Sequence, residues 1–288
     1  MRYVCFIMLF MGAAAMADEP VWHDFDFGVS DALGFGKERV ALLLRARIDA
    51  ADCHVQLDTG AGETMMWHSK GAAGAGARPR RVTVQIGDVK KEIDADEANL
   101  AALGNERCAG VAATVGNGFF DHGTLTIDLK GERFAFAPGS GLGARADAPT
   151  MRYLRSGGAG LPLVEVVLDN GRRGQALLDT GAARFALVAT SAAQWSELSG
   201  GLALTDTSAV RSFNATNVKD STPSQCFDTL VAGRMSVGGR QLRQTMVSYC
   251  QGKDFHLDEP IIGVLGLLPL AGHRIVLDYV AQRWLLTD

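Results

Sequence analysis

The chain has few aromatic residues and few cysteines, and these shortages exclude several kinds of site. Phe, Trp and Tyr together make up 7% of its 288 residues. Its five cysteines include no Cys-x-x-Cys pair, and no His-x-x-x-His spacing occurs, so we expect no metal centre. The Gly-x-Ser-x-Gly motif is also missing, which argues against a serine hydrolase of the α/β type.

Strong charge of either sign is missing too. The net charge is −4 and the isoelectric point is near 5.9, so there is no basic footprint for nucleic acid. A glycine-rich stretch at residues 139–144 superficially matches a dinucleotide fingerprint. It follows Pro138 and no helical pattern comes after it, so we interpret it as a linker and expect no cofactor.

Long apolar runs are confined to the amino terminus. Arg2 precedes an apolar run from residue 3 to residue 15, and the small-residue pattern Ala15-Met16-Ala17 follows. This pattern predicts a signal peptide over residues 1–17. The run is too short to span a bilayer, so we expect no stable membrane insertion after its removal. The predicted location is outside the cytoplasm, either periplasmic or secreted.

What the chain does have is a repeated tetrapeptide. Asp58-Thr59-Gly60-Ala61 recurs as Asp179-Thr180-Gly181-Ala182, each time after an apolar stretch that ends in leucine. A lone Asp-Thr-Gly is usually only a turn, but two copies in equivalent strand–turn contexts favour a pair of facing carboxylates. Carboxyl groups held that close share a proton, so that one acts as a base on water while the other acts as an acid.

The rest of the chain repeats as well. A shift of 150 positions superposes Gly116 on Gly266 and Asp128 on Asp278, whereas the tetrapeptides are only 121 positions apart. The second half therefore carries about 29 extra residues after its motif. Each half is predicted to contain a strand, the Asp-Thr-Gly turn, a hairpin, an apolar strand that ends in glycine, and a final hairpin.

These repeats predict an all-β protein with two lobes. The predicted parts are an amino-terminal lobe over residues 18–138, a linker over residues 139–160 and a carboxy-terminal lobe over residues 161–288. Residues 161–168 and 175–178 are expected to form a hairpin around an Asn-Gly turn. Short helices are expected only at residues 191–198, behind a Thr190 cap, and at residues 96–103.

Four cysteines remain after removal of the signal peptide, which would take Cys5 with it. An even number in an exported chain indicates two disulfides, for which three connectivities are possible. Their distribution between the halves favours Cys53–Cys108 and Cys226–Cys250. Buried free thiols are the alternative.

Over nearly its whole mature length the chain resembles the aspartic proteases. The resemblance rests on the two motifs and on Val115-Gly116 and Leu265-Gly266. It implies a bilobal pepsin-like acid-protease fold, with two pseudo-twofold-related β-barrel lobes. It also implies that Asp58 and Asp179 hold the attacking water, with support from the rest of each motif: Thr59, Gly60, Ala61, Thr180, Gly181 and Ala182. The alanines lack the hydroxyl that often bonds a catalytic carboxylate in pepsin-like enzymes, so milder acidity is expected for activity.

One stretch departs from the family pattern. Residues 68–81, where family members carry a flap hairpin, are rich in Gly and Ala and contain no aromatic residue. The flap is expected to be short, or its role taken by residues 190–226 with Trp195 or Phe213 over the substrate. Ordinary packing inside the lobe is the alternative for both aromatic residues.

The leading hypothesis is thus an exported aspartic endopeptidase, a monomer that acts on a protein or peptide substrate. No long propeptide is expected, because only about twenty residues separate the predicted cleavage point from the first predicted strand. The rival is a catalytically weak or inactive binding or regulatory module with the same fold. A glycosidase with two carboxylates would not require twin Asp-Thr-Gly loops.

Overall fold

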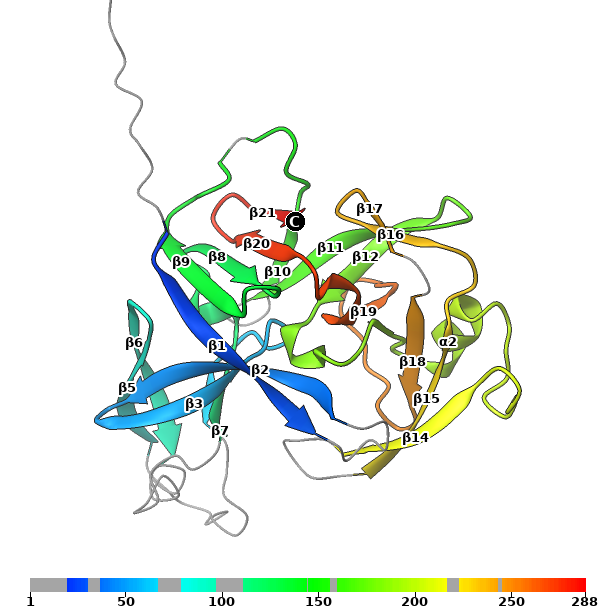
Figure 1. Ribbon diagram of the computed structural model, residues 1–288, viewed down its shortest axis with the longest axis horizontal. Helices are drawn as coiled ribbons and strands as arrows, with labels where there is room; N and C mark the ends of the chain where they lie inside the picture. The colour runs from blue at the N-terminus through cyan, green and yellow to red at the C-terminus, as the bar shows by residue number, and fades with distance from the viewer. Residues whose placement is uncertain are drawn as a thin grey trace, which may run out of the picture.

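The computed structural model is built mostly of β-strands, which form two mixed sheets (Figure 1). It describes residues 20–30, 37–66, 79–96, 111–143, 145–155, 160–216, 223–242 and 245–288. Within these ranges there is one α-helix, α2 (Ala192–Leu198). No helix in these ranges is long and apolar enough to cross a membrane.

The first sheet holds eleven strands in the order β21-β20-β8-β9-β1-β2-β3-β7-β4, with β5 and β6 attached beside β2. Its strands are β1 (Trp22–Ser30), β2 (Glu38–Ile48), β3 (Ala51–Leu57), β4 (Met65–Met66), β5 (Pro79–Ile86), β6 (Val89–Asp96), β7 (Val111–Val115), β8 (Gly123–Asp128), β9 (Arg133–Pro138), β20 (Arg274–Asp278) and β21 (Arg283–Thr287).

The second sheet holds ten strands in the order β14-β15-β18-β13-β19-β12-β11-β16-β17, with β10 paired to β11. Its strands are β10 (Arg152–Arg155), β11 (Gly160–Leu168), β12 (Arg173–Leu178), β13 (Leu187–Val188), β14 (Arg211–Thr216), β15 (Pro223–Leu230), β16 (Met235–Val237), β17 (Arg240–Leu242), β18 (Met246–Cys250) and β19 (Gly263–Leu265).

Strand β2 shows why these segments are extended. Leu44, Ala46 and Ile48 are buried, whereas Arg45 and Arg47 between them face solvent. Alternation with a period of two gives a strand one apolar and one polar face, and the apolar face packs on the core. The predicted hairpin at the start of the second half is confirmed, because β11 pairs antiparallel with β12.

The sequence repeat is visible in the pairing of the strands. Strand β3 runs parallel to β7, and β12 runs parallel to β19 in the same register relative to the two motifs. Where β8 and β20 pair antiparallel, Thr126 lies opposite Val276, a residue 150 positions later. Matched residues of the two halves therefore face each other at this point, as a local twofold axis through the pair requires.

The extra residues of the second half lie where the repeat places them. Helix α2 and strands β14 and β15 all fall between the second motif and β16. The predicted helix is confirmed, although its cap is Ser191 rather than Thr190, since the Ser191 hydroxyl accepts the Gln194 N–H. Trp195 is buried, which confirms the packing interpretation of this residue.

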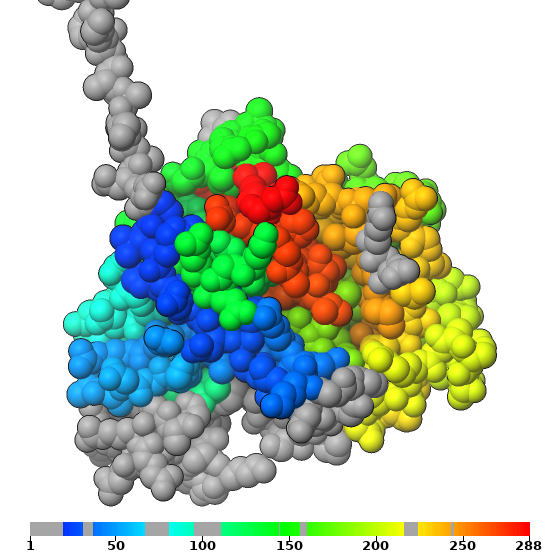
Figure 2. Space-filling view, in the orientation of Figure 1, coloured from blue at the N-terminus to red at the C-terminus, as the bar shows by residue number. Residues whose placement is uncertain are grey.

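Two features differ from the predicted division of the chain into two lobes and a linker. The predicted linker contributes a strand, β10, which pairs with β11. Strands β20 and β21, at the carboxy-terminal end, join the first sheet through β8. In Figure 2 the red surface of these last residues adjoins the green surface of the first half and the orange surface of the second. The predicted lobe boundaries remain a prediction.

One predicted disulfide is confirmed. Cys226 and Cys250 lie opposite each other on β15 and β18 and are bonded. Cys53 is also disulfide-bonded. Its predicted partner, Cys108, lies outside the described residues, as does most of the predicted helix at 96–103, whose first residue is the last of β6.

Candidate active site

The two aspartates occupy equivalent positions at the ends of strands. Strand β3 ends at Leu57, and the Asp58 N–H donates to the carbonyl of Val115 at 3.0 Å. Strand β12 ends at Leu178, and the Asp179 N–H donates to the carbonyl of Leu265 at 2.9 Å. Each aspartate is thus fixed by the apolar strand that ends in glycine, as the repeat predicts.

Those terminal glycines are required by close packing of the backbone. A Cβ atom on Gly116 would lie 2.4 Å from the carbonyl oxygen of Glu63, and one on Gly266 would lie 2.3 Å from that of Ala182. Both distances are too short for any side chain. The apolar-Gly signature therefore reflects the space that each Asp-Thr-Gly-Ala loop needs beside it.

The two loops are joined by their threonines, which are fully buried. The Thr59 N–H donates to the Thr180 hydroxyl at 3.0 Å, and the Thr180 N–H donates to the Thr59 hydroxyl at 2.9 Å. Each hydroxyl then donates across to the other half, Thr59 to the carbonyl of Leu178 at 2.6 Å and Thr180 to that of Leu57 at 2.8 Å. Four reciprocal hydrogen bonds hold the loops together.

This exchange of hydrogen bonds between the two threonines also brings the carboxyl groups together. A Cβ atom on Gly60 would lie 2.6 Å from the carboxyl carbon of Asp179, and one on Gly181 would lie 2.7 Å from that of Asp58. Each carboxyl group therefore lies against the glycine of the opposite loop, in space that any side chain would fill. The structure thus brings together all the motif residues that the sequence singles out.

The carboxyl groups influence each other's protonation. Burial raises the pKa of Asp179 well above its ordinary value, and the neighbouring charge of Asp58 raises it further. Burial also raises the pKa of Asp58, although a hydrogen bond from Asp179 and the N–H groups of Gly60 and Ala61 oppose this rise. Both residues still keep some exposure to solvent. A pair of this kind holds one proton between two carboxyl groups over a range of pH.

A buried amide supports the first loop. Asn117, which is 1% exposed, donates through Nδ2 to the carbonyls of Thr59 at 2.7 Å, Ala61 at 3.0 Å and Gly160 at 3.0 Å. Its Oδ1 accepts the hydroxyl of Tyr279 at 2.8 Å. One side chain therefore links the first loop to the start of β11 and to the carboxy-terminal hairpin.

Ionic contacts lie just beyond the second loop instead. Arg184 is buried just beyond the motif, and its Nε lies 2.7 Å from Glu38 at the start of β2. Its Nη2 lies 3.2 Å from the buried carboxylate of Asp228. Asp228 also accepts from Arg211 at 2.6 Å and from the Ser248 hydroxyl at 2.5 Å.

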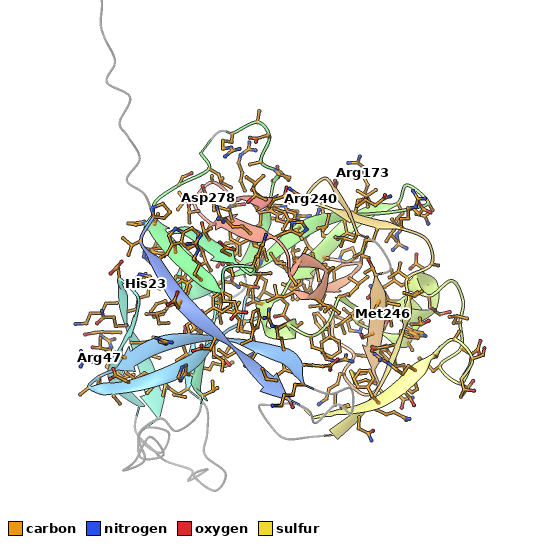
Figure 3. All side chains as sticks on the ribbon, viewed as in Figure 1. His23, Arg47, Arg173, Arg240, Met246 and Asp278 are labelled. Carbon is orange, nitrogen blue, oxygen red and sulfur yellow. A yellow bond between two sulfur atoms is a disulfide. The ribbon has the colours of Figure 1, made fainter. Side chains whose placement is uncertain are left out.

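A cavity of about 230 Å³ lies beside this ionic cluster. Its wall combines Arg184 and Asp228 with apolar residues from both halves, among them Leu129, Met246 and Leu267. Met246, which is labelled in Figure 3, reaches this wall from β18. Phe213 is buried too, with the guanidinium of Arg184 4.4 Å from its ring centre.

Sequence reasoning missed Asn117, Tyr279, Arg184 and Asp228. A signal for Asn117 was present, because the repeat matches this polar residue with Leu267 in the second half. No comparable signal marked Arg184, whose partners come from distant strands. The stretch 67–78, which covers most of the segment matched to a flap, lies outside the described residues.

The described ranges contain no group of three or more His, Cys, Asp or Glu side chains that could hold a metal ion. No protein-family model matches the chain. No curated protein matches it in sequence.

Proposed function

We propose that the protein is an exported aspartic endopeptidase with a two-lobed, pepsin-like fold. The observation that carries this proposal is the reciprocal approach of Asp58 and Asp179, each against the glycine of the opposite loop. An inactive fold would have no chemical need for two facing carboxyl groups, which are costly to bury together. The predicted signal peptide and the Cys226–Cys250 disulfide support export.

Peptide hydrolysis at such a pair proceeds by proton transfers in both directions. One carboxylate takes a proton from a water molecule while the water oxygen forms a bond to the carbonyl carbon of the peptide. The other carboxyl group gives its proton to the carbonyl oxygen, so a neutral tetrahedral diol results. The first group then returns its proton to the amide nitrogen, the C–N bond breaks, and the second group recovers its proton from the hydroxyl. The net reaction consumes one water molecule.

The surroundings of the pair suit this cycle. The threonine exchange fixes the distance between the loops, so no reorganisation is needed when the proton moves. Burial raises the pKa of both carboxyl groups. The proton therefore stays on the pair to higher pH than on an ordinary aspartate, and we expect activity under mild rather than strong acidity.

The test is a peptide-library assay of the purified mature protein from pH 3 to pH 7, with and without pepstatin, an inhibitor of aspartic proteases. The proposal expects cleavage inside peptides that pepstatin suppresses. Tight binding of library peptides without any cleavage across this range would instead support a binding or regulatory module with the same fold.

A further inference from the structure

The two loops differ in what lies behind them. Behind the first loop, the Tyr279 hydroxyl donates to Asn117, which donates to the carbonyls of Thr59 and Ala61. The orientation of the Asn117 amide is fixed by its neighbours, because a reversed amide would place its oxygen against three carbonyl oxygens. Its two N–H hydrogens serve three acceptors, so one hydrogen is shared.

This chain of hydrogen bonds leads to the carboxyl group of Asp58. The carbonyl of Thr59 and the N–H of Gly60 belong to the same peptide unit, and hydrogen bonding from that N–H lowers the pKa of Asp58. A hydrogen bond accepted by the carbonyl of a peptide polarises its N–H and strengthens the bond that the N–H donates. Such a donor favours the ionised form of the carboxyl group that it contacts.

The second loop has no such amide at the matched position. The repeat matches Asn117 with Leu267 and Tyr279 with Leu129, and neither leucine carries a polar side-chain atom. Both leucines are buried, and both line the cavity of about 230 Å³. The Gly181 N–H donates to Asp179 at 2.7 Å, but the matched side chain cannot polarise its peptide unit.

We propose that Asn117 and Tyr279 are positioning residues that make Asp58 the ionised member of the pair and leave the shared proton on Asp179. In the proposed peptidase, Asp58 would then be the base that takes the proton from water, and Asp179 the acid that protonates the carbonyl oxygen. These catalytic roles rest on the proposed function, whereas the location of the proton does not.

The other titratable groups around this chain of hydrogen bonds are few. Asp179 faces Asp58 directly. Tyr153, whose ring lies edge-on to that of Tyr279 at 5.2 Å, and Asp121 both act on the Tyr279 hydroxyl. That hydroxyl is buried, which raises its pKa well above the ordinary value. It therefore remains protonated, and a donor, at every pH at which the aspartates titrate.

The first test compares Tyr279→Phe with a matched control, Tyr249→Phe. Both changes remove one hydroxyl that donates a hydrogen bond, but the Tyr249 hydroxyl donates to Asp254, outside this chain. Loss of the Tyr279 donor should raise the pKa of Asp58, so the acid limb of the kcat/KM profile should move to higher pH. We expect a shift of about half a pH unit, or about threefold lower activity on the acid side. The control variant should keep the pH profile of the unmodified protein.

The second test does not depend on peptide cleavage by the protein. Site-resolved carbon-13 NMR of the aspartate carboxyl groups, assigned with Asp58→Asn and Asp179→Asn, follows each group during a pH titration of the whole protein. In the unmodified protein, Asp58 should ionise at lower pH than Asp179. Tyr279→Phe should reduce the difference between the two pH values of ionisation.

Ionisation of Asp179 before Asp58, or an equal response to Tyr279→Phe and Tyr249→Phe, would overturn the inference. The order of ionisation in the unmodified protein decides the matter even if Tyr279→Phe does not fold. Failure of the proposed function would appear separately, as missing peptide cleavage in a protein whose carboxyl groups still ionise in the expected order.

Discussion

The two Asp-Thr-Gly-Ala loops have the same sequence and exchange the same threonine hydrogen bonds, yet different groups lie behind them. The threonine exchange treats both loops alike. Behind the first loop lies a neutral network centred on Asn117, and beyond the second lies an ionic cluster centred on Arg184. The comparison shows that backbone geometry stays paired where both loops must meet, while the side chains behind them have diverged.

The loops first differ in charge three residues past each motif glycine. Glu63 follows the first motif and is exposed, whereas Arg184 occupies the matched place after the second motif and is buried. A charge at the surface contributes little to stability, but a buried charge depends on its partners. The same position in the repeat should therefore matter much more in one half than in the other.

The largest effect on stability is expected from Arg184→Ala. It leaves the carboxylate of Asp228, which is 3% exposed, with one arginine fewer, and it breaks the link to Glu38. Removal of one partner from a buried ion pair typically costs about 3–5 kcal/mol. Urea unfolding with a circular dichroism readout measures the loss.

Two variants sharpen this prediction. Arg211→Ala removes the other arginine bound to Asp228, but its side chain is 50% exposed, so a cost of about 1 kcal/mol or less is expected. Glu63→Ala, at the matched position of the first half, should change stability by about 0.5 kcal/mol or less. Equal losses for Arg184→Ala and Glu63→Ala would break the comparison.

A comparable and symmetrical effect is expected from the threonines. Thr59→Val removes the acceptor of the Thr180 N–H and the donor to the Leu178 carbonyl. Thr180→Val removes the acceptor of the Thr59 N–H and the donor to the Leu57 carbonyl. Each buried polar group left without a partner costs about 1–3 kcal/mol. The same unfolding measurement should give similar losses for the two variants.

The serine variants are the controls. Thr59→Ser and Thr180→Ser keep the hydroxyl and should retain most of the stability that the valine variants lose. A large loss in only one of the two valine variants would show that the exchange is not shared equally between the loops.

Much of the fold could be predicted from local patterns in the sequence. The repeat, the hairpin of β11 and β12, helix α2 and the Cys226–Cys250 bond all depend on residue types at short spacing or on comparison of the halves. Strand β10 was missed because its four residues include two arginines and show no clear apolar alternation. The pairing of β20 with β8 joins residues about 150 positions apart, and a local pattern cannot specify it.

The candidate site shows the same division. The aspartates, threonines and glycines were recognisable because the motif occurs twice. The roles of Asn117 and Tyr279 depend on a hydrogen bond between residues 162 positions apart. The partners of Asn117 and Arg184 lie far away in the sequence, so no local pattern indicates these contacts.

The most direct measurement is the kcat/KM for peptide cleavage by Asp58→Asn, Asp179→Asn and the double variant, each with its fold checked by circular dichroism. If the two loops form a single catalytic pair, each single variant should lose about 10³-fold or more. The double variant should then be no worse than either single one, because the groups act as a unit. A single variant that keeps near-full activity, or losses that multiply in the double variant, would contradict a shared pair.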